Sequence, residues 1–176
     1  MICPTIQTDR LIIHRYKESD IDVQYQFLQD ERLHQFISPP ELTKEEELEV
    51  IKKWITHSDT DPHERWVIEL KNNHQPIGNI SVNGIDKKNN YCNVGYVILF
   101  DFQGFGYATE ALKAVSDYLL IERKYHLLEC SCNELNKQSS RVMIKAGFTK
   151  DGYLPNRKVN LDGSYSGVEY YSKQLT

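Results

Sequence analysis

Residues 102–112 read FQGFGYATEAL, and this stretch decides the fold more than any other part of the chain. It joins an apolar run, 94–100, to a helical pattern of apolar residues that continues to Leu119. A strand, a glycine turn and a helix in this order direct several free backbone N–H groups, and the positive end of the helix dipole, to one point. Gly104 and Gly106 let the backbone approach a ligand closely. The stretch therefore predicts an anion site, most often one for a pyrophosphate.

Three interpretations of the glycine turn compete on these residues alone. A dinucleotide-binding turn has a third glycine where this chain has Thr109, although an acidic residue, Glu129, does follow at the expected distance. That turn also belongs to a repeated strand–helix pattern, which the chain lacks. A P-loop is excluded, because no Gly-Lys-Ser/Thr closes the turn. The third interpretation is a tight strand-to-helix connection that binds nothing.

The composition is that of a globular protein. A chain of 176 residues suffices for one domain with a full core, so residues 1–176 are expected to form a single domain. The net charge of −4 argues against nucleic acid as a partner, because phosphate binding needs a basic face. No leader opens the chain and no apolar run of about 18 residues is present to span a bilayer. We therefore expect a cytoplasmic protein with no membrane partner.

The cysteines indicate buried thiols. Cys3, Cys92, Cys130 and Cys132 show no Cys-x-x-Cys spacing, and the last two would share one face of a predicted strand. Apolar burial of thiols is a more frequent reason for such cysteines than a disulfide or a metal site. No metal is expected.

Hydrophobic periodicity predicts an α+β domain around one mixed sheet, with the order βααβββαβαββ. The predicted strands are 11–14, 66–70, 76–82, 91–99, 126–132, 148–153 and 169–175, and the helices are 19–28, a segment from 43 to about 55, the segment after the glycine turn to 124, and 136–146. Ser19 is expected to cap the first helix, and Thr43 forms a capping box with Glu46. Pro39-Pro40 separates these two helices. Gly147 is expected to close the last helix.

Several segments outside the glycine turn carry a resemblance to a known family. They are Gly95-Tyr96 before the turn, Gln103-x-x-Gly106-x-Ala108 across it, and Asn136-x-x-Ser139 and Lys145-Ala146-Gly147-Phe148 after it. In this order and spacing they resemble the GNAT superfamily of acetyl-CoA-dependent N-acetyltransferases. Further segments fit its RimJ/RimL-like branch, whose founders acetylate ribosomal-protein N-termini: Thr8-Asp9-Arg10-Leu11, Pro76-Ile77-Gly78 and Tyr170-Tyr171-Ser172.

The resemblance implies the GNAT fold, a mixed and mostly antiparallel sheet that is splayed at its centre and flanked by helices. It also implies acetyl-CoA as co-substrate. Backbone amides of the turn would wrap the pyrophosphate, and the strand before it would pair with the pantetheine arm. Asn136 would bond that arm, besides its possible role as a helix cap. The cofactor-binding residues expected on this basis are Tyr96, Val97, Ile98, Gln103, Gly104, Phe105, Gly106, Tyr107, Ala108, Thr109, Asn136 and Ser139.

The implied reaction is direct attack of a neutral primary amine on the acetyl thioester. Ser139 is the candidate acid for the departing thiolate, a modest task because a thiol has a pKa of about 8.5. A base must take the proton of the amine, and the candidates are Glu169, which we take first, Asp151 and Glu69. The backbone N–H near Ile98 is expected to polarise the thioester carbonyl.

Two positions depart from the family pattern. Many RimJ/RimL-like proteins have an acidic residue where this chain has Asn93, and the ribosomal enzymes favour a glutamate where it has Lys158. The acceptor therefore stays open among a protein N-terminus, a polyamine, an aminoglycoside and another small amine. The departures also support an alternative, a non-catalytic acyl-CoA-binding module with a degenerate acceptor site. GNAT domains are often dimers, so a homodimer is a further expectation.

Other side chains are weaker candidates for the site, because core or surface roles are the commoner interpretation for each. An acceptor pocket could be lined by Tyr16, Phe36, Trp54, Tyr153 and Tyr165, and the adenosine phosphates could be met by Lys137 and Arg141.

Overall fold

An eight-stranded sheet with the order β1-β2-β3-β4-β5-β6-β8-β7 forms the centre of the fold. The structure is a computed structural model that describes residues 3–37, 42–57 and 64–175. The strands are β1 (Ile6–Gln7), β2 (Leu11–Arg15), β3 (Arg65–Leu70), β4 (Pro76–Asp86), β5 (Tyr91–Ile98), β6 (Leu127–Asn133), β7 (Thr149–Val159) and β8 (Tyr165–Lys173). The helices are α1 (Ile21–Gln29), α2 (Lys44–His57), α3 (Tyr107–Ile121) and α4 (Lys137–Lys145), with short 3-10 helices η1 (Glu18–Asp20), η2 (Glu31–Leu33) and η3 (Phe100–Phe102).

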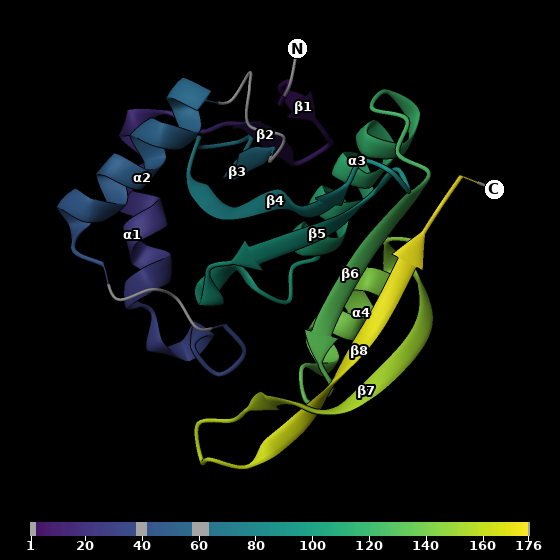
Figure 1. The fold of residues 1–176 in the computed structure, drawn as a ribbon. Coiled ribbons are helices and arrows are strands. Elements are labelled where there is room, and N and C mark those ends of the chain that lie inside the picture. The colour runs from purple at the N-terminus through teal and green to yellow at the C-terminus, as the bar shows by residue number, and fades with distance from the viewer. Residues whose placement is uncertain (1–2, 38–41, 58–63, 176) are drawn as a thin grey trace.

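The sheet opens at its centre, between β5 and β6. These two strands are parallel and are joined through α3, whereas the other neighbours are antiparallel. They pair only over residues 91–93 and 127–129, although β5 continues to Ile98 and β6 to Asn133. In Figure 1, β6, β8 and β7 turn away from the strands that precede them. The mixed, mostly antiparallel and centrally splayed sheet is confirmed.

Helices cover both faces of the sheet, because successive side chains of a strand point to opposite faces. Trp66 of β3 is fully buried in the cluster that contains Leu119 of α3. Its neighbour Val67 packs on the other face, with Ile51 of α2. Val97 of β5 contacts the α1 cluster on that same second face. Helix α4 packs on the same face as α3, where it contacts α3, β6 and β7.

Two helix boundaries differ from the prediction. Helix α1 begins at Ile21 with Asp20, not Ser19, at the N-cap position. The reason is a preceding 3-10 turn, which Asp20 closes by accepting the Lys17 N–H at 2.8 Å. Helix α3 ends at Ile121 rather than at 124. Here Lys124 adopts a φ of 59°, a left-handed conformation that ends a helix.

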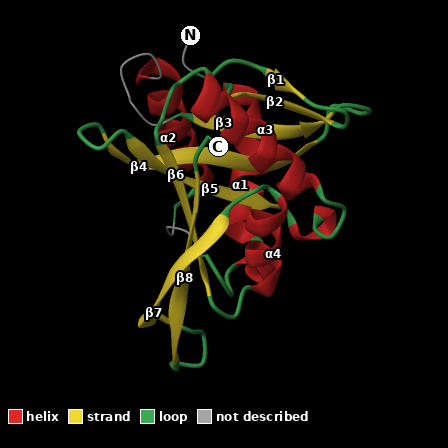
Figure 2. Cartoon of the chain, turned by 90° about the vertical axis from the view of Figure 1, so that its right-hand side faces the viewer, coloured by secondary structure: helices red, strands yellow, loops and turns green. Residues whose placement is uncertain are grey.

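The C-terminal hairpin is longer than predicted. Strand β7 runs to Val159 rather than to 153, and β8 begins at Tyr165 rather than at 169. The hairpin projects from the rest of the molecule in Figure 2. Residues 154–159 are exposed throughout, so no apolar alternation could reveal a strand there. Strand β1, with two residues, was likewise too short to predict.

Several local predictions are confirmed. In the capping box, the Thr43 N–H donates to Glu46 at 2.8 Å and the Glu46 N–H donates to the Thr43 hydroxyl at 3.2 Å. Gly147 follows α4 with a φ of 92°. All four cysteines are buried free thiols. Pro39-Pro40 lies outside the described residues.

Within the described ranges, we find no cluster of His, Cys, Asp or Glu that could hold a metal ion, and no helix that could cross a membrane.

Candidate functional site

The glycine loop ends in a helix N-terminus with free N–H groups. Helix α3 has Gly106 at its N-cap with a φ of 84°, and no side chain of the described residues caps it. The first intrahelical bond runs from the Glu110 N–H to the Gly106 carbonyl at 3.1 Å, so the N–H groups of residues 107–109 have no helical partner. Gly104 also has a φ of 84°. Because residues 104–106 are exposed, these donors are accessible to an anion.

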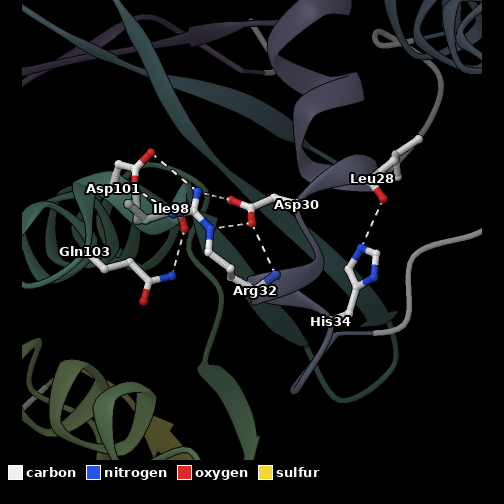
Figure 3. Close-up of polar contacts among 7 residues, drawn as sticks. All are labelled: Leu28, Asp30, Arg32, His34, Ile98, Asp101 and Gln103. Atoms are coloured by element: carbon white, nitrogen blue, oxygen red, sulfur yellow. Dashed lines mark hydrogen bonds and ion pairs between the residues drawn. The ribbon is translucent and has the colours of Figure 1, made fainter. Parts of the chain in front are cut away.

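The edge of β5 that faces β6 is unpaired beyond Asn93. Alternate residues direct their backbone groups to opposite edges, and the Leu99 N–H bonds β4 at the Ile77 carbonyl. Tyr96 and Ile98 therefore face the β6 side. The Ile98 carbonyl already accepts the side-chain amide of Gln103 at 3.0 Å (Figure 3). What this edge offers a ligand is thus the Ile98 N–H and both backbone groups of Tyr96.

A hydrogen-bonded pair of hydroxyls bridges the opening between β5 and α4. The Tyr96 hydroxyl lies 2.9 Å from Ser139 Oγ and 3.2 Å from the Ser139 carbonyl oxygen. Asn136 caps α4 by accepting the Ser139 N–H at 3.1 Å, which fixes the first turn that carries Ser139. Burial raises the pKa of Tyr96 above its usual range, so the phenol stays protonated. The pair can therefore hold and donate protons near the unpaired edge of β5.

Glu169 of β8 lies beside the same turn of α4 and pairs with two lysines. It is opposite Cys132 of β6 in the sheet register. Its carboxylate accepts hydrogen bonds from Lys150 and Tyr171, both at 2.8 Å, and Lys137 lies 3.7 Å away. The Lys150 hydrogen bond is the main reason why the pKa of Glu169 is lowered. Burial raises the pKa of Cys132 to about 11, so this neighbour stays a thiol.

The other two candidate bases lie elsewhere. Glu69 of β3 sits between two imidazoles, with His14 at 3.2 Å and His74 at 2.6 Å. It is separated from β6 by β4 and β5. Asp151 is exposed at a register shift of the outer strand β7. Of the predicted catalytic side chains, the structure therefore brings Ser139 and Glu169 to the same helix turn and leaves these two apart.

A carboxylate that sequence reasoning missed lies where β5 and β6 separate. Glu129 of β6 is in register with Asn93, in the last pair before the strands diverge. Neighbours in register share a face of the sheet. Asn93 is on the α1 face, four residues before Val97 on the same strand. The acidic side chain of Glu129 therefore lies beside Asn93, the position where many RimJ/RimL-like proteins have an acidic residue. Only the register between β5 and β6 reveals that Glu129 and Asn93 are neighbours. At the second departure from the family pattern, Lys158 is exposed on the C-terminal hairpin.

The remaining aromatic candidates have other partners. Tyr16 is buried, donates to Gln24 at 2.7 Å and meets the ring of Trp54 edge-on at 5.3 Å. Phe36 is half-buried after η2. The Tyr153 ring lies against Gly167 of the facing strand, and Tyr165 is exposed. Tyr16 is therefore a core residue, and Trp54 is partly buried against it. Of the predicted phosphate-binding cations, Lys137 is drawn toward Glu169, and Arg141 is exposed on α4.

Comparison with known proteins accounts for this arrangement. Residues 10–149 match the family model described as "Acetyltransferase (GNAT) domain". The chain belongs to the GNAT family. YnaD of Bacillus subtilis, described as an uncharacterized N-acetyltransferase, is 27% identical over 166 residues, which are 94% of each chain. This GNAT protein is accordingly an acetyl-CoA-dependent N-acetyltransferase.

Two solved structures share its fold. RimL, a ribosomal L7/L12 alpha-N-protein acetyltransferase in complex with coenzyme A, superimposes with a TM-score of 0.85 at 21% identity, covering 99% of this chain and 98% of RimL. The microcin C7 self-immunity acetyltransferase MccE, in complex with acetyl-CoA and AMP, gives a TM-score of 0.81 at 20% identity, with coverage of 96% and 94%. The predicted GNAT fold and the predicted co-substrate, acetyl-CoA, are confirmed.

Proposed function

We propose that this GNAT enzyme transfers acetyl from acetyl-CoA to a primary amine by direct attack, and that a protein N-terminus is the acceptor to test first. One observation carries the proposal: the uncapped N-terminus of α3 adjoins the unpaired edge of β5. RimL, whose fold is shared, acts on the N-terminus of a ribosomal protein. We also propose that the enzyme works in the cytoplasm, because its cysteines are free thiols, as in reducing compartments.

The cofactor would lie along β5, with its pyrophosphate on residues 104–109. The amides of the pantetheine arm would pair with Tyr96 and with the Ile98 N–H, the two unpaired positions of the strand edge. The Val97 backbone faces β4, so Val97 would contact the arm through its side chain only. In this arrangement the Ile98 N–H can also stabilise the negative charge that develops on the thioester oxygen.

The hydroxyl pair of Tyr96 and Ser139 would protonate the departing thiolate. Ser139 Oγ gives its proton to the sulfur while Tyr96, which lies 2.9 Å away, donates a hydrogen bond to Ser139 Oγ and keeps its own proton. Tyr96 in turn releases its bond to the Ser139 carbonyl. The proton that the attacking amine loses returns to Ser139 through water, so that both hydroxyls are protonated again after the transfer. The relay needs no charged acid, since the thiolate is a tolerable leaving group.

Two carboxylates compete for the role of base. Glu169 lies on the α4 face, with Ser139, and its cationic partners make it a weak proton acceptor. Glu129 lies on the opposite face at the point where the strands diverge. An amine that enters from the face opposite Ser139 would meet Glu129, directly or through water. Comparing Glu129→Gln with Glu169→Gln separates the two roles: the base variant lowers kcat most.

The test is an acceptor screen. Purified protein is incubated with acetyl-CoA and peptides of varied N-termini, polyamines, aminoglycosides and amino acids, and free thiol release is followed. We expect acceptor-dependent release with one class, peptides first. Release with polyamines or aminoglycosides alone would overturn the peptide proposal and keep the acetyl transfer. Thiol release that ignores every acceptor, although acetyl-CoA binds, would contradict the proposed amine transfer.

A further inference from the structure

The turn between β1 and β2 lies against the start of α3. Its contact there is Glu110, in the first turn of the helix. Glu110 accepts the Thr8 hydroxyl at 2.6 Å, the Arg10 backbone N–H at 3.0 Å and Arg10 Nε at 2.7 Å. Burial opposes ionisation of Glu110, but these hydrogen bonds outweigh it and lower its pKa. The carboxylate thus fixes the Arg10 side chain in one orientation.

Arg10 extends from Glu110 onto the glycine loop. Its Nη1 donates to the Phe105 carbonyl at 2.9 Å. The guanidinium carbon lies 4.6 Å from the centre of the Tyr107 ring. Arg10 Nη2 lies 3.4 Å from where a Cβ on Gly106 would be. One planar side chain therefore contacts three successive residues of the loop while its Nε bonds the helix.

These contacts set the direction of a backbone donor. The Phe105 carbonyl and the Gly106 N–H belong to one trans peptide unit and point in opposite directions. Because Arg10 binds that carbonyl, the Gly106 N–H points away from Arg10. Glycine conformations are numerous, so Gly104 and Gly106 alone would let this peptide unit turn over. The arginine removes that freedom.

We propose that Arg10, oriented by Glu110, is a positioning residue that holds the loop in the conformation that binds the coenzyme A pyrophosphate. The proposal rests on the proposed cofactor role of the loop. Geometry, and not charge, is the basis of the effect, because the ion pair with Glu110 already offsets the Arg10 charge. Lysine retains the charge but lacks the planar fork that reaches the helix and the loop together. Lysine therefore cannot replace Arg10.

Arg32 provides a matched control. It too pairs with carboxylates, at 2.8 Å from Asp30 and from Asp101, and it stacks on the Phe100 ring at 4.5 Å. Figure 3 shows this pairing beside the Gln103 contact with Ile98. Arg32 thus resembles Arg10 in chemistry and exposure and lies next to the loop, but its contacts stop short of residues 104–106.

The experiment is calorimetric titration with coenzyme A, alongside thermal unfolding of each variant. We expect Arg10→Ala and Arg10→Lys each to weaken binding about tenfold, as for a lost charge-assisted hydrogen bond. Arg32→Ala should stay within about twofold of wild type. The steady-state signature is a raised KM for acetyl-CoA with an unchanged KM for the acceptor. A merely structural role would lower the melting temperature without this selectivity.

Each outcome is decisive. Wild-type affinity in Arg10→Lys would overturn positioning in favour of charge alone, and equal losses in Arg10→Ala and Arg32→Ala would also overturn it. If the Arg10 variants do not fold, Glu110→Gln preserves the shape and should weaken coenzyme A binding several-fold; unchanged binding would refute the proposal. Gly106→Asp distinguishes a failure of the positioning role of Arg10 from a failure of the proposed cofactor role of the loop. If it loses binding while Arg10 variants bind normally, only the positioning role fails; if it also binds normally, the loop assignment itself fails.

Discussion

The two strands that diverge at the centre of the sheet lead into regions built from different groups. After β5, the glycine loop presents backbone N–H groups, and its geometry depends on Gly104 and Gly106. After β6, the first turn of α4 presents side chains, among them Ser139. The backbone donors of the first region come from one continuous segment of the chain. The second is assembled from β5, β6, β7, β8 and α4, and both Ser139 and Glu169 have a hydrogen-bond partner from another element.

This difference separates binding from chemistry. Backbone donors at a helix N-terminus bind an anion whatever side chains surround them, provided that the conformation is kept. Side-chain acids and bases work only in the protonation states that their neighbours set. Changes in the loop should therefore alter cofactor affinity, whereas changes near α4 should alter turnover. The experiments below test that division.

The largest effect is expected from Gly106→Asp. It places a carboxylate among the donors of the loop, at a φ of 84°. We expect coenzyme A affinity to fall by about 100-fold or more, roughly 2.7 kcal/mol. Gly163→Asp is the control: it has a φ of 81° in the open turn of the C-terminal hairpin, so backbone strain is matched. Calorimetry on both variants is the measurement, and equal affinities would contradict the backbone-built site.

A smaller effect, on turnover, is expected from Ser139→Ala and Tyr96→Phe. Each should lower kcat about 10- to 100-fold. This is a small effect for the loss of a general acid, because a thiolate leaves readily. Affinity for coenzyme A should change by less than about threefold. If the hydroxyls act as one relay, the double variant should be no slower than the slower single variant. Additive losses in a double-mutant cycle would argue for independent roles.

The pH dependence of kcat/KM should follow the pKa of the acceptor amine. Because Lys150, foremost, lowers the pKa of Glu169 below its ordinary value of 4.5, this carboxylate stays ionised above that pH and is protonated only as the pH falls below it. The rise of kcat/KM near neutral pH should then report the acceptor ammonium, which for an α-amine has a pKa of about 8. An acceptor whose amine has a lower pKa should lower the midpoint of this rise by the same number of pH units. A midpoint that is the same for every acceptor would instead assign it to the enzyme.

The smallest effect is expected from Asn136→Ala. Loss of the cap should reduce the free energy of unfolding by about 1 kcal/mol. If Asn136 also bonds pantetheine, coenzyme A affinity should fall about fivefold, or ~1 kcal/mol. Asn136→Asp keeps the cap and removes the amide donor, so it should lower affinity without lowering stability. Denaturant unfolding and calorimetry give the two quantities, and full affinity in both variants would leave only the capping role.

The features that could be predicted from the sequence are those that depend on residues close together in the chain. The glycine loop, the capping box at Thr43 and the end of α4 at Gly147 were predicted correctly, since each depends on residues a few positions apart. The first cap was misplaced because Ser19 lies inside a 3-10 turn that Asp20 closes. The far half of β7 was missed because its residues 154–159 are exposed on both faces. Its length depends on pairing with β8 rather than on its own pattern.

The same distinction holds for the site. Glycine conformations, helix caps and apolar periodicity are local properties, so the chain alone predicted a strand, a glycine turn and a helix N-terminus on an α+β fold. Which side chains meet near that loop depends on strand register and packing over distances of 30 to 100 residues, as for Glu129 beside Asn93 and Arg10 on Phe105. Such contacts have no local energetic signature. The protonation state of Glu169, the pairing of Tyr96 with Ser139 and the orientation of the loop peptide therefore arose only when the sheet was assembled.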